Sequence, residues 1–114
     1  MKTSELTGAD LNKAVAECLG IKHTRFQGQV IDQFCNPLMY DDDWSLAGEI
    51  IEREKIGIWW ATHFVDGEGN EYGNHWYAED KGGDHVQTGA TPLIAAMRCY
   101  VASKQGEQDA NEAV

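Results

Sequence analysis

The sequence predicts a single α+β domain with three helices packed on a small, mainly antiparallel sheet of three to four strands. Three segments carry helix caps and helical hydrophobic spacing, and two strand-like runs flank a glycine-rich turn. The 114 residues are 42% hydrophobic and include four Trp, enough for one modest core. We expect residues 1–106 to form the domain and the acidic residues 107–114 to form a flexible tail.

The first helix is expected to begin after Thr7, whose hydroxyl can cap the free amides, with Asp10 three residues on. Leu6 and Leu11 stand where a hydrophobic staple places its two apolar residues. Gly20 is expected to end the helix because glycine readily adopts the left-handed conformation of a helix C-terminus.

The following stretch is less regular. Residues 30–34 could form a strand after the break at Gln27 and Gly28. The carboxylates of residues 41–43 stand where a second helix begins, and they can cap it and meet the positive end of its dipole. A metal held by these three Asp would need further ligands elsewhere, so we favour the capping role. This helix should run to about Lys55.

The strongest strand patterns are residues 57–65 and 71–79, joined by a turn at 66–70. Residues 85–89 predict a short third strand after a second turn at 81–84. The turn at 66–70 resembles a calcium loop only superficially, because it lacks the glycine and the terminal glutamate that such a loop requires.

The hairpin register can be argued from its aromatic residues. If Val65 faces Glu71, then Trp60 faces Trp76, and aromatic pairs gather on one face, an arrangement that stabilises sheets. We therefore expect Trp60 and Trp76 to be cross-strand neighbours in the core.

The clearest helix is the last, residues 91–106. Thr91 can cap it, Pro92 suits its first position, and Gly106 can close it. Its pattern predicts an amphipathic helix, with one side facing the core and the other facing solvent. The inward residues would be Leu93, Ile94, Met97, Tyr100 and Val101, and the outward ones Arg98, Ser103 and Lys104.

Three segments of the chain, residues 91–104, 6–16 and 50–56, resemble the NinX-like family of phage proteins in the same order. The resemblance implies a phage or prophage source and a small αβα-sandwich-like domain. The family brings no assigned activity and no catalytic motif, so the resemblance implies no reaction.

Composition limits the classes of partner. Nineteen acidic against nine basic side chains give a net charge of −10, which opposes direct binding to nucleic acid and to anionic membranes. The start of the chain lacks an apolar signal segment, and we expect a cytoplasmic protein of the bacterial host cell. Cys18, Cys35 and Cys99 lack close spacing and are expected to be reduced, buried thiols.

Four residues of the hairpin, Trp59, His63, His75 and Tyr77, are expected on the face opposite the Trp60 pair. Two His provide too few ligands for zinc, so we expect no metal site and no cofactor. An αβα sandwich would require a helix to cover this face. Otherwise Trp59 and Tyr77 could bind a protein or stack on a planar ligand.

These observations favour a non-enzymatic phage accessory protein that binds a host or phage protein. The binding surface would be the aromatic face or an acidic surface formed by Glu49, Glu52 and Glu54, which could imitate nucleic-acid phosphates. The alternative is a small-ligand-binding protein or enzyme that uses the aromatic and His residues of the hairpin; no nucleophile elbow or phosphate loop supports catalysis. A small sheet also has free edges, which would allow a homodimer.

Overall fold

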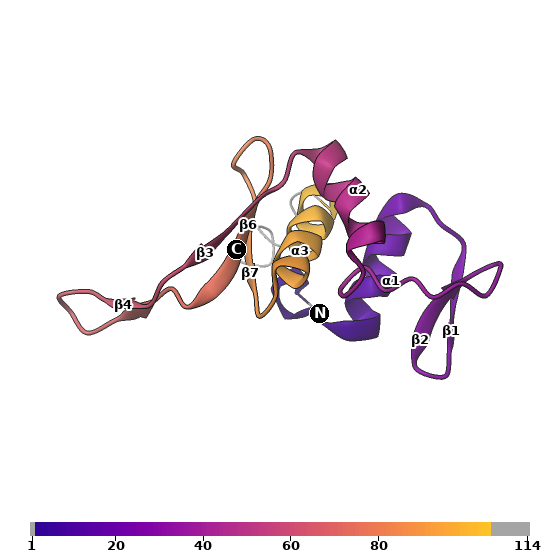
Figure 1. Ribbon diagram of the computed structural model, residues 1–114, viewed down its shortest axis with the longest axis horizontal. Helices are drawn as coiled ribbons and strands as arrows, with labels where there is room; N and C mark the ends of the chain where they lie inside the picture. The colour runs from indigo at the N-terminus through magenta and orange to yellow at the C-terminus, as the bar shows by residue number, and fades with distance from the viewer. Residues whose placement is uncertain (1, 106–114) are drawn as a thin grey trace.

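A computed structural model of the chain describes residues 2–105. Its three helices and two main antiparallel sheets confirm the α+β class (Figure 1). In chain order the elements are η1 (Thr3–Glu5), α1 (Gly8–Leu19), β1 (His23–Phe26), β2 (Gln29–Asp32), α2 (Trp44–Glu54), β3 (Gly57–Ala61), β4 (Phe64–Val65), β5 (Glu71–Tyr72), β6 (His75–Glu79), β7 (Val86–Gly89) and α3 (Pro92–Gln105). Gly106 and the expected tail at 107–114 lie outside the described residues.

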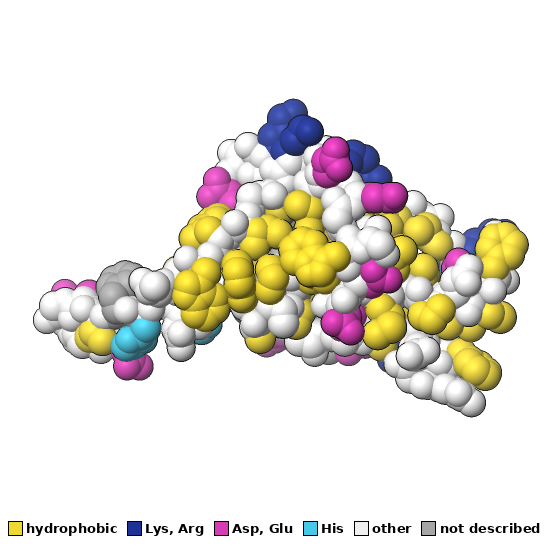
Figure 2. Space-filling model, in the orientation of Figure 1, with side chains coloured by type: hydrophobic (Ala, Val, Ile, Leu, Met, Phe, Trp, Pro, Cys, Tyr) yellow, Lys and Arg dark blue, Asp and Glu magenta, His cyan; other side chains and the backbone are white. Residues whose placement is uncertain are grey.

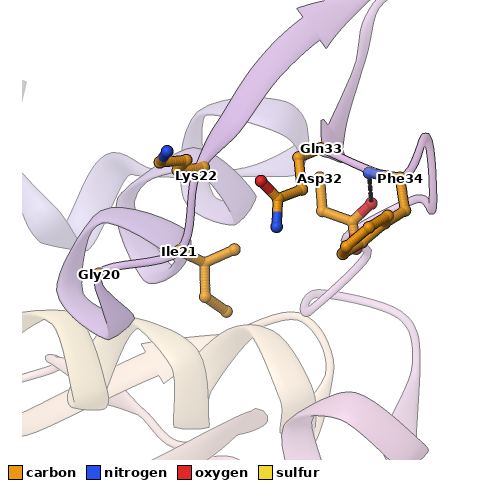
Figure 3. A pocket seen from close by; sticks show the side chains of 6 residues that line it. All are labelled: Gly20, Ile21, Lys22, Asp32, Gln33 and Phe34. Atoms are coloured by element: carbon orange, nitrogen blue, oxygen red, sulfur yellow. Dashed lines mark hydrogen bonds between the residues drawn. The ribbon is translucent and has the colours of Figure 1, made fainter.

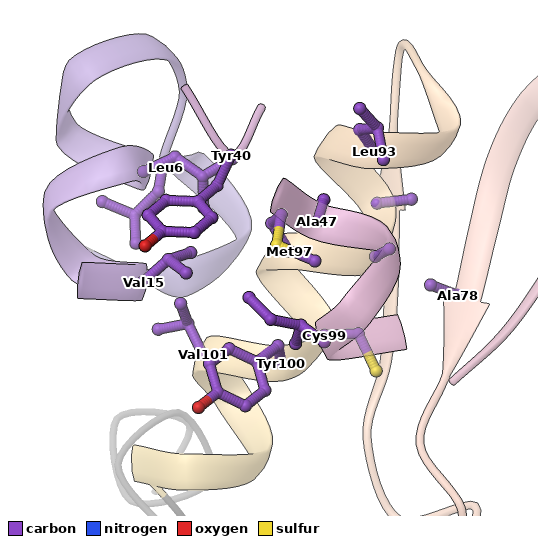
Figure 4. Close-up of a cluster of buried hydrophobic side chains, with 14 of the residues drawn as sticks. Leu6, Val15, Tyr40, Ala47, Ala78, Leu93, Met97, Cys99, Tyr100 and Val101 are labelled. Atoms are coloured by element: carbon purple, nitrogen blue, oxygen red, sulfur yellow. The ribbon is translucent and has the colours of Figure 1, made fainter. Parts of the chain in front are cut away.

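Helix α3 is the centre of the molecule. The sheet β3-β6-β7 lies on one side of it, and α1 and α2 lie on the other (Figure 1). Figure 4 shows Tyr100 and Val101 on the side of α1, whereas Cys99 lies on the side of the sheet. The three helices therefore stand on one side of the sheet, and the helix that packs directly against it is α3.

The five residues expected to face inward from α3 are buried or pack against the core, as predicted, but the helix is buried on more sides than that pattern requires. Its fully buried residues include four small ones at positions 95, 96, 99 and 102, which let neighbouring elements approach closely. Arg98, expected to face solvent, donates from Nε to the Leu6 carbonyl (2.9 Å) and from Nη1 to the Thr88 carbonyl (2.7 Å). It therefore joins the N-terminal segment to β7.

The helix boundaries follow their caps. The Thr91 hydroxyl accepts from the Ile94 amide (3.2 Å), and the Asp43 carboxylate accepts from the Ser45 amide (2.9 Å). Gly20 ends α1 in the left-handed conformation, at φ 72°. Thr7 occupies the N-cap position of α1, but its hydroxyl makes no capping hydrogen bond, so that part of the prediction is wrong.

The predicted hairpin register is confirmed in both of its paired segments, β3-β6 and β4-β5. Trp60 pairs with Trp76 and Val65 pairs with Glu71, so the two paired segments share one register. The third strand is β7, which pairs with β6. The strand expected at 30–34 is β2, and it pairs with β1, which was not predicted.

The hairpin is interrupted between β3-β6 and β4-β5. Gly73 and Asn74 both adopt left-handed conformations (φ 81° and 61°), and a side chain on Gly73 would lie 1.9 Å from the Thr62 carbonyl oxygen. Residues 62–74, here called the arm, project beyond the three-stranded sheet at the left of Figure 1. The molecule consequently measures 53 × 28 × 27 Å.

The two faces of the sheet β3-β6-β7 are distinguished by Gly89. A Cβ atom there would lie 2.6 Å from the Ala95 amide nitrogen of α3, so the side of the sheet that carries Gly89 faces the helix. Trp76 and Trp60 belong to the same cross-strand row, and their rings meet edge to face at 5.5 Å. The expected place of this pair in the core is wrong for Trp60, which is 46% exposed because the sheet extends past the end of the helix.

Candidate functional site

The face of the sheet that points away from α3 is open to solvent in the part of the chain that the structure describes. Alternation along the strands places one residue of each adjacent pair on this side. We call it the open face, and define it by Trp59, Ala61, His75, Tyr77, Glu79, Val86 and Thr88. A covering helix, one of the two arrangements considered for it, is absent among residues 2–105.

The centre of the open face is a stacked aromatic pair. The rings of Trp59 and Tyr77 are parallel to within 12°, with centroids 5.6 Å apart. His75 lies next to Tyr77, at 6.3 Å between ring centroids. Trp59 is 41% exposed, so a large aromatic surface that the core does not use is presented to solvent.

The pair is held by the strands beneath it. Trp59 and Tyr77 are direct cross-strand partners, and Thr88 of β7 continues the same row. Val86, two residues earlier on β7, is 49% exposed on the same face. Val86 and Thr88 were not among the predicted site residues, although strict alternation along 85–89 places both beside the hairpin aromatics.

His63 does not join this group. Its Nε2 lies 3.4 Å from the Glu71 carboxylate on the exposed arm, beyond the break at Gly73 and Asn74. His63 on the arm and His75 on β6 therefore lie on opposite sides of this break. Within residues 2–105 there is no cluster of three or more His, Cys, Asp or Glu that could hold a metal ion.

The three glutamates considered as an acidic surface differ in their surroundings. Glu49 and Glu52 are exposed on α2. Glu54 instead lies between Lys104 Nζ and Arg53 Nε, each 3.1 Å from one of its carboxylate oxygens. Burial opposes ionisation of Glu54, but hydrogen bonds from these two cations lower its pKa below the ordinary value. The expectation that Glu54 faces water beside the other two is wrong.

Charge is distributed unevenly over the surface. Figure 2 shows Lys and Arg side chains gathered above α2, whereas the arm shows His and acidic side chains. Residues 62–74 contain Asp66, Glu68 and Glu71 but no Lys or Arg. The same view shows hydrophobic side chains across the middle of the molecule, over the strands and α3.

The three thiols do not form a reactive group. Burial raises the pKa of Cys99 to about 12, and burial also raises the pKa of Cys18. Both are therefore protonated thiols near neutral pH. Cys35 is exposed and Cys18 is half-buried, so the expectation of buried thiols holds for Cys99 alone among the three.

A surface pocket of about 390 Å³ lies at the other end of the molecule (Figure 3). It is lined by residues 20–22 and 32–34. Asp32 accepts from the amides of Phe34 and Asn36, both at 2.9 Å, and these bonds help to lower its pKa, chiefly through Asn36. The pocket does not contain the aromatic and His residues of the hairpin.

Comparison with known proteins identifies the family but adds no activity. In the described part of the chain, no helix is both long and apolar enough to cross a membrane. A search of curated proteins gave no significant match. The family model described as Bacteriophage P22, NinX matches residues 2–104, which is almost the whole chain. The chain therefore belongs to the NinX family of phage proteins.

Proposed function

We propose that this chain is a phage accessory protein that binds another protein through the open face and makes or breaks no covalent bond. The observation that supports this is the exposed, stacked pair of Trp59 and Tyr77 on a sheet face that no helix among residues 2–105 covers. Trp and Tyr are the residues most enriched at the energetic centres of protein interfaces. Held in place by paired strands, their rings lose little conformational freedom on binding.

The surroundings of the pair resemble an interface more than a ligand pocket. Polar side chains, His75 and Thr88, flank the aromatic centre, as the polar rim of an interface does. Because the rings of Trp59 and Tyr77 already contact each other, a planar ligand has no room between them. The small-ligand alternative would need these residues to converge around a hollow, and they instead share one side of a sheet.

The test is recovery of a partner from lysate of phage-infected host cells, with three versions of the chain. Wild type is compared with the double variant Trp59→Ala, Tyr77→Ala and with a matched control, Phe26→Ala, Phe34→Ala. The control residues are exposed aromatics (58% and 73%) near the β1-β2 hairpin at the opposite end. We expect wild type and control to retain the same protein and the double variant to retain about tenfold less or worse.

Equal recovery by the double variant, with its fold intact by circular dichroism, would contradict the proposal. A small molecule that co-purifies with wild type in native mass spectrometry and is lost from the double variant would support the ligand alternative instead.

A further inference from the structure

The outer edges of the strands in this molecule are not equally protected. Unpaired backbone groups at a sheet edge invite another strand, and proteins usually block such edges with charge, proline or a covering segment. At β2 the covering segment is residues 36–38, where the Leu38 amide donates to the Val30 carbonyl (2.8 Å) and Pro37 bridges Ile31.

Strand β1 and the β7 edge of the three-stranded sheet are also guarded. On β1, Arg25 forms an ion pair with Asp10 of α1. At the β7 end of the three-stranded sheet, Arg98 Nη1 donates to the Thr88 carbonyl (2.7 Å). A side chain of α3 therefore occupies a backbone acceptor on that edge.

Strand β3 has no covering segment, charged side chain or proline at its outer edge within residues 2–105. It is the opposite edge of the sheet, and within residues 2–105 its strand partner is β6 on one side, with no strand on the other. Its sequence, Gly-Ile-Trp-Trp-Ala, contains no charge and no proline. Trp59 and Trp60, which project to opposite sides of the strand, are 41% and 46% exposed. The edge is thus hydrophobic on both sides.

Charge indicates which partner fits this edge. Each chain carries a net charge of −10, so two copies repel one another wherever acidic surfaces meet. A twofold axis brings a surface against itself, and an uncharged strand can meet its own copy without like-charge contact. Aromatic side chains on both sides of the strand are self-complementary in the same way.

We propose that two copies of this chain pair antiparallel through β3, around a twofold axis. The result is a continuous six-stranded sheet in the order β7-β6-β3-β3-β6-β7. The open faces of both copies then adjoin, so the two Trp59–Tyr77 pairs form one aromatic surface on one side of the joined sheet. This inference concerns the strand edge, and it stands whether or not the open face binds another protein.

The test measures mass and backbone protection together. Light scattering of the full chain between about 1 and 100 μM should show the mass rise toward twice the 12.7 kDa of one copy. Over the same range, amide hydrogen exchange in residues 57–61 should slow by about tenfold, because pairing protects amides at the edge. Exchange in β7 should remain unchanged.

A matched pair of variants locates the contact. Trp60→Lys adds a charge to β3 without altering the open face, and we expect it to remain monomeric. Phe26→Lys makes the same change at an exposed aromatic of β1, and it should dimerise as wild type does. A monomer mass for wild type at the highest concentration overturns the proposal. So does a dimer in which exchange at residues 57–61 is independent of concentration, an outcome that does not depend on either variant folding.

Discussion

The two faces of the sheet β3-β6-β7 are built from the same strands, yet a helix covers one and none covers the other within the described residues. On the covered face, Ala78 is fully buried and Gly89 lies against the backbone of α3. On the open face, Trp59 and Tyr77 stack on each other. Both faces carry an aromatic pair, since Trp60 and Trp76 lie in the same row as Gly89. The comparison teaches that the small residues Ala78 and Gly89, which let the helix backbone approach closely, distinguish the covered face from the open one.

The largest effect is expected at the point of closest approach. Gly89→Val places side-chain atoms where the Ala95 nitrogen already lies 2.6 Å from the first carbon, so α3 must shift. We expect a loss of about 3 kcal/mol in unfolding free energy, measured by urea denaturation. The control is Gly57→Ala on β3, where a Cβ meets nothing within 4 Å. A loss under about 1 kcal/mol for Gly89→Val would mean that α3 does not rest on this face.

Removing an aromatic side chain should also destabilise the protein more on the covered face than on the open face. Trp76 packs against the core, whereas Trp59 is 41% exposed. We expect Trp76→Ala to reduce the unfolding free energy by about 2–3 kcal/mol and Trp59→Ala by about 1 kcal/mol or less. Equal losses in urea denaturation would show that the open face contributes as much to the core as the covered one.

The next effect concerns β7, which contributes residues to both faces. Its preceding turn is held by Asp80, which accepts from the amides of Asp84 (2.8 Å) and His85 (3.1 Å) and contacts His85 Nδ1 (2.8 Å). Burial opposes ionisation of Asp80, but these hydrogen bonds lower its pKa below the ordinary 3.8.

Because the folded state lowers this pKa, the ionised carboxylate stabilises the fold at neutral pH. That contribution is lost as pH falls below 3.8 and through the pKa of the folded state. Asp80→Asn should therefore reduce the unfolding free energy by about 1–2 kcal/mol at pH 7, and the difference from wild type should vanish in acid. A difference that is constant with pH in urea titrations would exclude the carboxylate charge as the cause.

The smallest effect is expected on α2. The double variant Glu49→Gln, Glu52→Gln removes two exposed charges without removing a contact, so the melting temperature should change by about 1 °C or less. Recovery of the partner from infected lysate should also be unchanged. Loss of the partner, together with release of the wild-type complex by salt, would instead assign binding to the acidic surface.

Much of the strand pairing could be predicted from the sequence because it depends on local features. The turn at 66–70 and the aromatic pairs together specify one register of the hairpin. The structure has that register, in which Trp60 pairs with Trp76. Caps such as Asp43 and Thr91 likewise depend on nearby residues. Strand β1 was missed because its residues are mostly exposed and lack hydrophobic alternation.

The surroundings of α3 could not be predicted in this way. Ala95, Ala96 and Ala102 give little signal on a helical wheel, yet each is nearly or fully buried because small residues admit neighbours on several sides. The candidate site was predicted in part. Trp59 and Tyr77 share a face as expected, whereas His63 is separated by the left-handed pair at Gly73 and Asn74, a break that alternation does not reveal.

That break has a consequence for how the family can vary. The register of strand pairing is the same on both sides of the break, since Ala61 pairs with His75 and Phe64 pairs with Tyr72. A short turn joining Ala61 to His75 would therefore close the hairpin without moving Trp59 or Tyr77. The entropic cost of closing a loop rises only slowly as the loop becomes longer. The arm is thus an insertion point, where segments of different length and chemistry can be exchanged while the rest of the sheet keeps its geometry.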